Sequence, residues 1–119
     1  MMKKIYRVKK QSEIDAIFKK RQYAASSAFV VNYINESSDP HFRFAISIGK
    51  KYGNAVNRNL IKRQIRAIIH KYKDQIKPVT FVIVVKPSAN TLSFTEIEAN
   101  IIKILEKAKL MEKTKWIKK

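Results

Sequence analysis

The sequence predicts an α+β fold in which helices pack against one β-sheet. One segment alternates apolar and polar residues cleanly, and two others are short runs rich in β-branched and aromatic residues, as strands are. Three further segments repeat apolar residues at helical spacing, and each begins near a residue that can cap a helix. Of the 119 residues, 45% are hydrophobic, so we expect a single domain with one core.

At both ends the chain is basic. Residues 1–10 have no clear period and are expected to form an N-terminal arm, and residues 113–119 a basic tail, of one domain that spans residues 1–119. The first helix is expected to start with Ser12 as its N-cap, with Asp15 three residues later, and to end near Arg21.

Three strands are expected between the helices. Ala28–Ile34 and Phe42–Ile48 are separated by the turn-forming residues Asn35–Pro40, so they are predicted to form an antiparallel hairpin. In the first of them, odd-numbered residues share one face and even-numbered residues the other. Val79–Val85 is apolar almost throughout, which indicates a strand that is buried on both faces.

Two longer helices complete the fold. The second helix is expected to be capped by Asn54 or Asn57 and to run to about Tyr72. The third begins with the capping box formed by Ser93 and Glu96.

Positive charge dominates the composition. Lys and Arg number 26 against 9 Asp and Glu, which gives a net charge of +17, and no acidic residue occurs from Pro40 to Lys73. Residues 50–66 hold six of the basic residues. A solvated helix face usually mixes signs, because opposite charges one turn apart stabilise a helix and like charges destabilise it. The unopposed charge therefore indicates contact with a polyanion, with nucleic acid ahead of an anionic membrane.

Other functional classes find little support in the sequence. There is no cysteine, and no apolar run approaches the length of a membrane span, so a cytoplasmic protein is expected. His41 and His70 lie in different segments without acidic neighbours, which argues against a metal site or a general base. Ile14 and Phe18 could line a groove that stacks unpaired bases, although burial against the sheet is the commoner fate of such residues.

The order of residues within the basic block resembles the protein subunit of bacterial ribonuclease P. The shared pattern, Lys-Lys-x-Gly-Asn-Ala-Val-x-Arg-Asn-x-x-Lys-Arg-x-x-Arg, occupies residues 50–66. Further matches, which begin with Tyr6-Arg7-Val8-Lys9-Lys10 and include His41-Phe42-Arg43, follow in order along nearly the whole chain.

The resemblance implies an αβββαβα two-layer sandwich with a mostly antiparallel central sheet. It also implies a left-handed βαβ crossover through the basic helix, against the usual right-handed rule. One more strand is therefore expected than the residue patterns supply, either from a division of Phe42–Lys51 or from the ends of Ala28–Ile34.

The implied function is removal of the 5′ leader from precursor tRNA. In this family the RNA subunit with bound Mg²⁺ hydrolyses the phosphodiester, so the protein is expected to hold neither a metal site nor a catalytic side chain. The implied partners are the catalytic RNA, with one protein monomer per RNA, and precursor tRNA. The single-stranded leader is expected to lie in a cleft between the first helix and the sheet.

Carried over position by position, the resemblance assigns two groups of site residues. The RNA-binding group is Lys50, Lys51, Asn54, Arg58, Asn59, Lys62, Arg63 and Arg66. The leader-cleft group is Ile14, Phe18, Val30 and Asn32. Three positions depart from the family pattern: Leu60 stands where arginine is common, Ile14 where phenylalanine is common and Asn32 where tyrosine is common. The loss of two rings predicts weaker stacking, at ~1–3 kcal/mol per base.

Two alternatives remain open on the residues alone. A general RNA-binding or ribosomal protein without a role in cleavage fits the charge and the fold equally well, but not the specific basic run. A stand-alone metal-dependent nuclease would need clustered acids, and the nine acids of this chain are scattered.

Overall fold

The computed structural model describes residues 6–8, 10–34 and 41–111 of the chain. The predicted turn at 35–40, the basic tail at 113–119 and much of the N-terminal arm lie outside the described residues. The helices and strands follow the order αβββαβα, as expected. They are α1 (Gln11–Lys19), β1 (Tyr23–Ala25), β2 (Phe29–Ile34), β3 (Arg43–Ile48), α2 (Ala55–Lys71), β4 (Thr80–Val85) and α3 (Phe94–Lys107), with short 3₁₀ helices η2 (Lys50–Tyr52), η3 (Lys73–Gln75) and η4 (Pro87–Thr91).

The four strands form one sheet in the order β1-β2-β4-β3. β1 pairs with β2 and β2 pairs with β4, both antiparallel, while β3 pairs with β4 in parallel. The predicted hairpin between β2 and β3 is therefore wrong, because β4 lies between them. Alternation along a strand fixes which face is buried, but it does not fix which strand lies alongside.

The additional strand is β1, and neither of the expected sources supplies it. It holds only three residues, Tyr23–Ala25, which is too short for a period to be read from the sequence. Its register places Tyr23 opposite Asn32 and Ala25 opposite Val30.

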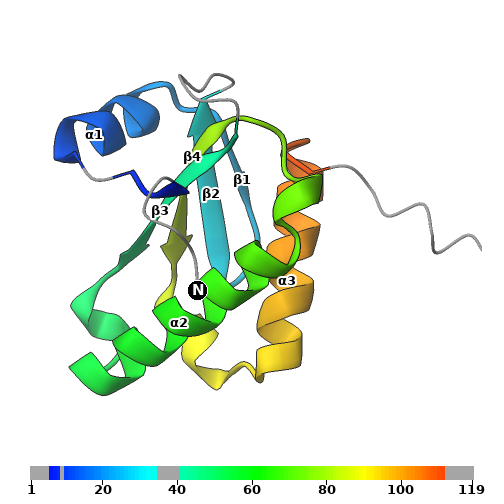
Figure 1. The fold of residues 1–119 in the computed structure, drawn as a ribbon. Coiled ribbons are helices and arrows are strands. Elements are labelled where there is room, and N and C mark those ends of the chain that lie inside the picture. Colours follow the sequence, from blue (N-terminus) through cyan, green and yellow to red (C-terminus); the bar gives the residue numbers. More distant parts are fainter. Residues whose placement is uncertain (1–5, 9, 35–40, 112–119) are drawn as a thin grey trace, which may run out of the picture.

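The connection from β3 to β4 is the predicted left-handed crossover. Both strands run downward in Figure 1, β3 forms the left edge of the sheet, and α2 crosses in front before the chain enters β4 to the right of β3. This arrangement brings the basic helix across the same face of the sheet as α3.

The main core lies between the sheet and the pair α2 and α3. Phe29 and Val31 of β2 and Phe81 and Ile83 of β4 are all at 0% exposure on this face. They meet an isoleucine stripe on α2 that ends in Ile69. The predicted faces of β2 and the burial of β4 are thus confirmed, and the same stripe forces the polar side of α2 outward.

The start of α1 differs from the prediction. Its N-cap is Lys10, which makes no side-chain capping bond, and Ser12 lies inside the helix. By contrast, Asn54 caps α2 through a bond from the Asn57 backbone N–H, and the Ser93 capping box of α3 is present in full.

Within the part of the chain that the structure describes, no helix combines the length and the apolar character that crossing a bilayer requires.

Candidate nucleic-acid interface

The 3₁₀ helix η2 and Gly53 connect β3 to the start of α2. Gly53 has φ +158° and ψ −169°, a conformation that residues with a Cβ rarely adopt. A Cβ added there would lie 3.4 Å from the side chain of Asn57. Asn54 then accepts the backbone N–H of Asn57 at 2.9 Å, which satisfies one of the free donors at the start of α2.

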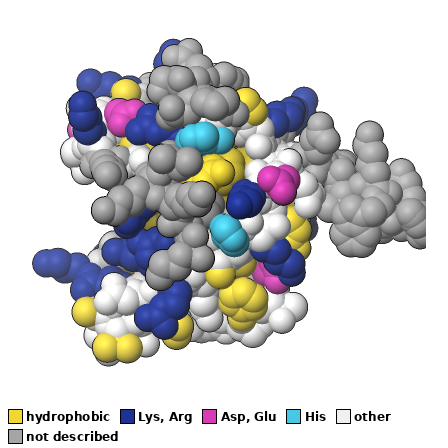
Figure 2. Space-filling model, viewed as in Figure 1, with side chains coloured by type: hydrophobic (Ala, Val, Ile, Leu, Met, Phe, Trp, Pro, Cys, Tyr) yellow, Lys and Arg dark blue, Asp and Glu magenta, His cyan; other side chains and the backbone are white. Residues whose placement is uncertain are grey.

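The eight predicted RNA-binding residues are all exposed or partly exposed, on η2, at the cap of α2 or along α2. Lys50 and Lys51 are exposed on η2, and Asn54 is exposed at the cap of α2. Along the helix, Arg58, Lys62 and Arg66 follow one another at single-turn spacing, with partial exposure. Figure 2 shows many Lys and Arg side chains over this side of the molecule and few Asp or Glu.

Four of the eight residues come together around a single hollow of about 690 Å³. Its lining residues are Arg7, Asn59, Lys62, Arg63, Arg66, Ala67 and His70. Arg7 and His70 were absent from the predicted site. In the sequence, His70 was considered only as a metal ligand or a general base, and Arg7 lies in an arm whose position along the sheet the sequence does not reveal.

Leu60 is one of two exposed apolar residues named on this surface. It is 46% exposed, and Val56, one turn earlier, is 74% exposed. The structure therefore places the departure from the family pattern where a ligand of α2 can reach it.

The four predicted leader-cleft residues lie on the other side of the sheet from α2, with Ile14 and Phe18 on α1 and Val30 and Asn32 on β2. Val30 and Asn32 alternate with the core residues of β2, so their side chains are on the α1 side. Phe18 is 37% exposed, and Ile14 is partly exposed. Asn32, however, is only 9% exposed, so it contributes little open surface to this face.

Tyr23 is an aromatic residue on this face that the sequence analysis missed. It is 62% exposed and pairs directly with Asn32 across β1 and β2. Paired residues of an antiparallel ladder project on the same side, so Tyr23 places a ring beside the position where the family pattern has a tyrosine. Tyr23 lies on β1, whose three residues are too few to show the alternation that predicts a strand.

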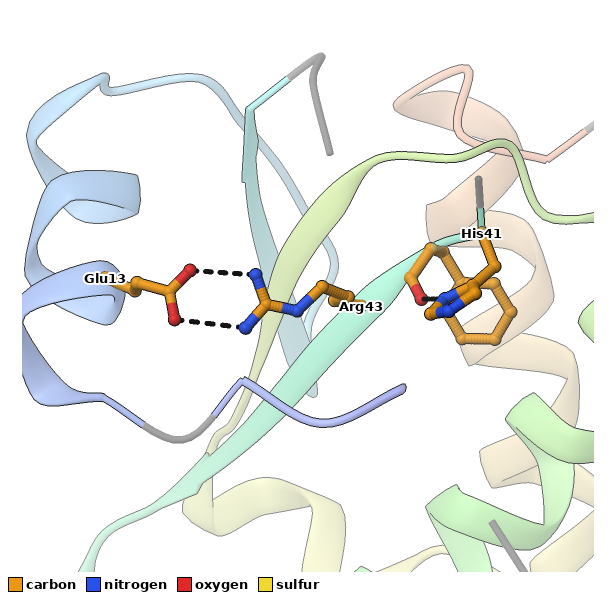
Figure 3. Close-up of polar contacts among 4 residues, drawn as sticks. Glu13, His41 and Arg43 are labelled. Atoms are coloured by element: carbon orange, nitrogen blue, oxygen red, sulfur yellow. Dashed lines mark hydrogen bonds and ion pairs between the residues drawn. The ribbon is translucent and has the colours of Figure 1, made fainter. Parts of the chain in front are cut away.

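An ion pair ties α1 to the sheet. Arg43 Nη1 and Nη2 donate to the two carboxylate oxygens of Glu13, over 2.8 and 3.0 Å (Figure 3). The hydrogen bond from Arg43 lowers the pKa of the Glu13 carboxyl below its ordinary value, and partial burial opposes it only in part. Ile17, fully buried on the next turn, supplies the apolar part of the same contact.

His41, two residues before Arg43 and just ahead of β3, has a structural environment. His41 Nδ1 lies 2.8 Å from the Phe42 carbonyl oxygen, and its ring centroid is 4.6 Å from that of Tyr6. Among the described residues, no three His, Cys, Asp or Glu side chains are grouped as metal ligands would be. The donor set of the basic hollow is cationic, which suits an anion and not a metal ion.

Comparison with known proteins yields one family. The family model for ribonuclease P matches residues 2–109 of the chain. The ribonuclease P protein component of Acholeplasma laidlawii is 47% identical over 113 residues, which cover 94% of this chain and 97% of that protein. The component from Enterococcus faecalis is 44% identical over 112 residues, covering 93% and 95%.

Solved structures agree in fold. The ribonuclease P protein of Staphylococcus aureus superposes with a TM-score of 0.85 at 34% identity, covering 90% of this chain and 98% of that one. A mutant of the S. aureus protein with defective mRNA degradation activity gives 0.87 at 35% identity, covering 91% and 92%.

Proposed function

Because the chain belongs to the ribonuclease P protein family, we propose that it binds the catalytic RNA through α2 and holds the 5′ leader of precursor tRNA on its α1 side. The observation that carries this proposal is the basic hollow of α2, where Lys62, Arg63 and Arg66 converge with Arg7 and no Asp or Glu is among the lining residues. Removal of the leader is the reaction of the whole ribonucleoprotein, of which this chain is a subunit.

The protein contributes to RNA binding through the attraction between its Lys and Arg side chains and the phosphates. Each phosphate neutralised by Lys or Arg releases condensed counterions, so binding is strong at low salt and weakens steeply as salt is added. A leader fixed on the α1 side keeps the scissile bond in one orientation relative to the RNA, which lowers the entropic part of the barrier. No side chain of this chain is assigned to attack, leave or transfer a proton.

We assign Mg²⁺ to the RNA subunit and its interface with substrate. The described residues do not fit a resident metal, because the carboxylates needed for a hard cation are not grouped. When bound to RNA, Mg²⁺ supplies an activated water and stabilises the charge that develops on the phosphate. The cations of α2 would lower the Mg²⁺ requirement by offsetting phosphate repulsion.

One protein per RNA in the cytoplasm is the assembly we propose. The net charge of +17 supports a monomer, because two copies without RNA would repel one another. Size measurement of the reconstituted complex tests the stoichiometry: a mass with two protein copies would contradict it.

The deciding experiment is reconstituted cleavage of precursor tRNA at low Mg²⁺ and moderate salt. The cognate RNA is assayed alone and with wild-type protein, Arg58→Ala, Arg66→Ala or the control Lys103→Ala, which removes an exposed charge from α3. Wild type and control should raise cleavage equally. Each arginine variant should bind more weakly and flatten the log–log salt dependence by about 0.7–0.9 per lost phosphate contact. Protein that leaves cleavage unchanged would refute the proposal.

A third arm contains protein without the RNA subunit. The S. aureus protein whose mutant is defective in mRNA degradation gives a reason to include it. Our proposal expects no tRNA maturation in this arm. Cleavage at the mature 5′ end by the protein alone would favour the nuclease alternative, and stable binding without any stimulation would favour a general RNA-binding protein.

A further inference from the structure

Arg7 sits at the free edge of the sheet. Its backbone forms a parallel bridge with Phe44 of β3, and the next residue, Val8, donates its N–H to the Phe44 carbonyl at 2.9 Å. Val8 is 7% exposed, so its side chain anchors this piece of the arm, whereas Arg7 is exposed. The position of the Arg7 side chain is therefore set by backbone bonds and by its buried neighbour.

Two hollows meet at this side chain. The first is the basic hollow of α2, and the second, of about 230 Å³, lies toward α1 and is lined in part by Ile14. Arg7, Lys62 and Arg66 line both hollows. They therefore form the passage between a predicted leader-cleft residue and the predicted RNA-binding helix.

Like charges crowd together in this passage. Burial lowers the pKa of the Arg66 guanidinium, and the positive charge of Arg7 lowers it further. No Asp or Glu lines either hollow among the described residues. Cations brought together from two separate segments, without an acid between them, are stabilised when an anion occupies the space that they share.

The anion that fits is a phosphate of a nucleotide chain. The Arg7 guanidinium can donate two parallel N–H bonds to phosphate oxygens. Lys62 and Arg66 of α2 add positive charge to the same hollow. The second hollow is too small for a duplex, and Ile14, one turn before Phe18 on α1, is part of its lining. A single strand that runs from α1 to α2 through these two hollows passes Arg7.

We propose that Arg7 binds one backbone phosphate of the single-stranded 5′ leader at the point where the leader passes from the α1 side of the sheet to α2. This proposal rests on the proposed function. It adds to it a residue outside the predicted site and a path that joins the two predicted sites.

The test uses the reconstituted holoenzyme and precursor tRNAs that carry one neutral methylphosphonate at successive leader linkages. With wild-type protein, the precursor tRNA that is neutral at one particular linkage should bind roughly tenfold more weakly than the precursor tRNAs modified at neighbouring linkages. The loss of one charge-assisted hydrogen bond predicts this factor. Arg7→Gln should weaken binding of the unmodified substrate by a similar factor. It should also abolish the penalty at that single linkage while leaving all others in place.

Controls separate the outcomes. Arg7→Lys keeps the charge and should recover part of the loss, and Lys103→Gln removes a charge from α3 and should change nothing. Because the bridge to Phe44 uses backbone atoms, Arg7→Gln should melt at the wild-type temperature. Equal weakening of leaderless tRNA would place Arg7 on the catalytic RNA and overturn the proposal, as would penalties unchanged by Arg7→Gln. Failure of the proposed function itself would give a different result: wild-type protein would not stimulate cleavage of precursor tRNA by the RNA subunit.

Discussion

The ion pair between Glu13 and Arg43 gives the sharpest prediction about how α1 is held. Replacing Glu13 by Gln keeps the size of the side chain and removes the charge from both hydrogen bonds, which span 2.8 and 3.0 Å. The pair is only partly shielded, since the Glu13 side chain is 37% exposed and the Arg43 side chain 17%. Solvent screening limits such pairs, so we expect a loss of about 1 kcal/mol in the free energy of unfolding. For a domain of this size that lowers Tm by about 4 °C.

The pH dependence identifies the carboxylate as the cause. The pKa of Glu13 is lowered in the folded state, so the stabilisation is fully present above the unfolded value of about 4.3. It is lost as the pH falls through the lower folded value. The difference in unfolding free energy between wild type and Glu13→Gln should therefore be constant from pH 6 to 8 and shrink below about pH 4.

Thermal and urea unfolding followed by circular dichroism measure this difference. Asp15→Asn is the matched control, because Asp15 lies on the same helix and its carboxylate accepts a hydrogen bond from Gln11 at 3.0 Å. A double-mutant cycle with Arg43→Gln isolates the coupling, expected at about 0.5–1 kcal/mol. A coupling of zero, or a difference that does not change with pH, would refute the reasoning.

Three other predictions concern separate parts of the fold. Phe18→Ala should weaken binding of precursor tRNA by about 5- to 150-fold if the ring stacks on one base, and leave binding of leaderless tRNA unchanged, in a competition assay that compares the two. Leu60→Arg should steepen the log–log salt dependence of RNA binding by about 0.7–0.9, and an unchanged slope would mean that this exposed position does not face RNA. Ser93→Ala removes half of the α3 capping box and should cost about 1 kcal/mol in thermal unfolding, without any change in that salt slope.

Sequence reasoning succeeded where the determining contacts are local. The caps at Asn54 and Ser93 depend on residues three positions away, and the faces of β2 depend on alternation within six residues. The family pattern supplied the order of elements and the crossover, which propensity alone would not have given. These features could therefore be predicted from the sequence alone.

Apart from the Ser12 cap of α1, which was a local error, the errors arose where distant segments meet. Nothing near β2 in the sequence says that β4, and not β3, lies beside it, and the three-residue β1 carries no period of its own. The same limit applies to the site. Arg7 joins the basic hollow only because its arm pairs with Phe44, and Tyr23 reaches Asn32 only through the β1 register.

The strand order has a consequence for how this protein is made. β4 is a middle strand of the sheet, yet it is the last strand to leave the ribosome. Until Thr80–Val85 emerges, β1 and β2 form only a two-stranded ribbon, which is marginal in water, and β3 has no strand partner within the sheet. The basic helix is synthesised before the sheet that it covers can close. The nascent chain therefore carries its RNA-attracting segment through a period in which no complete core restrains it.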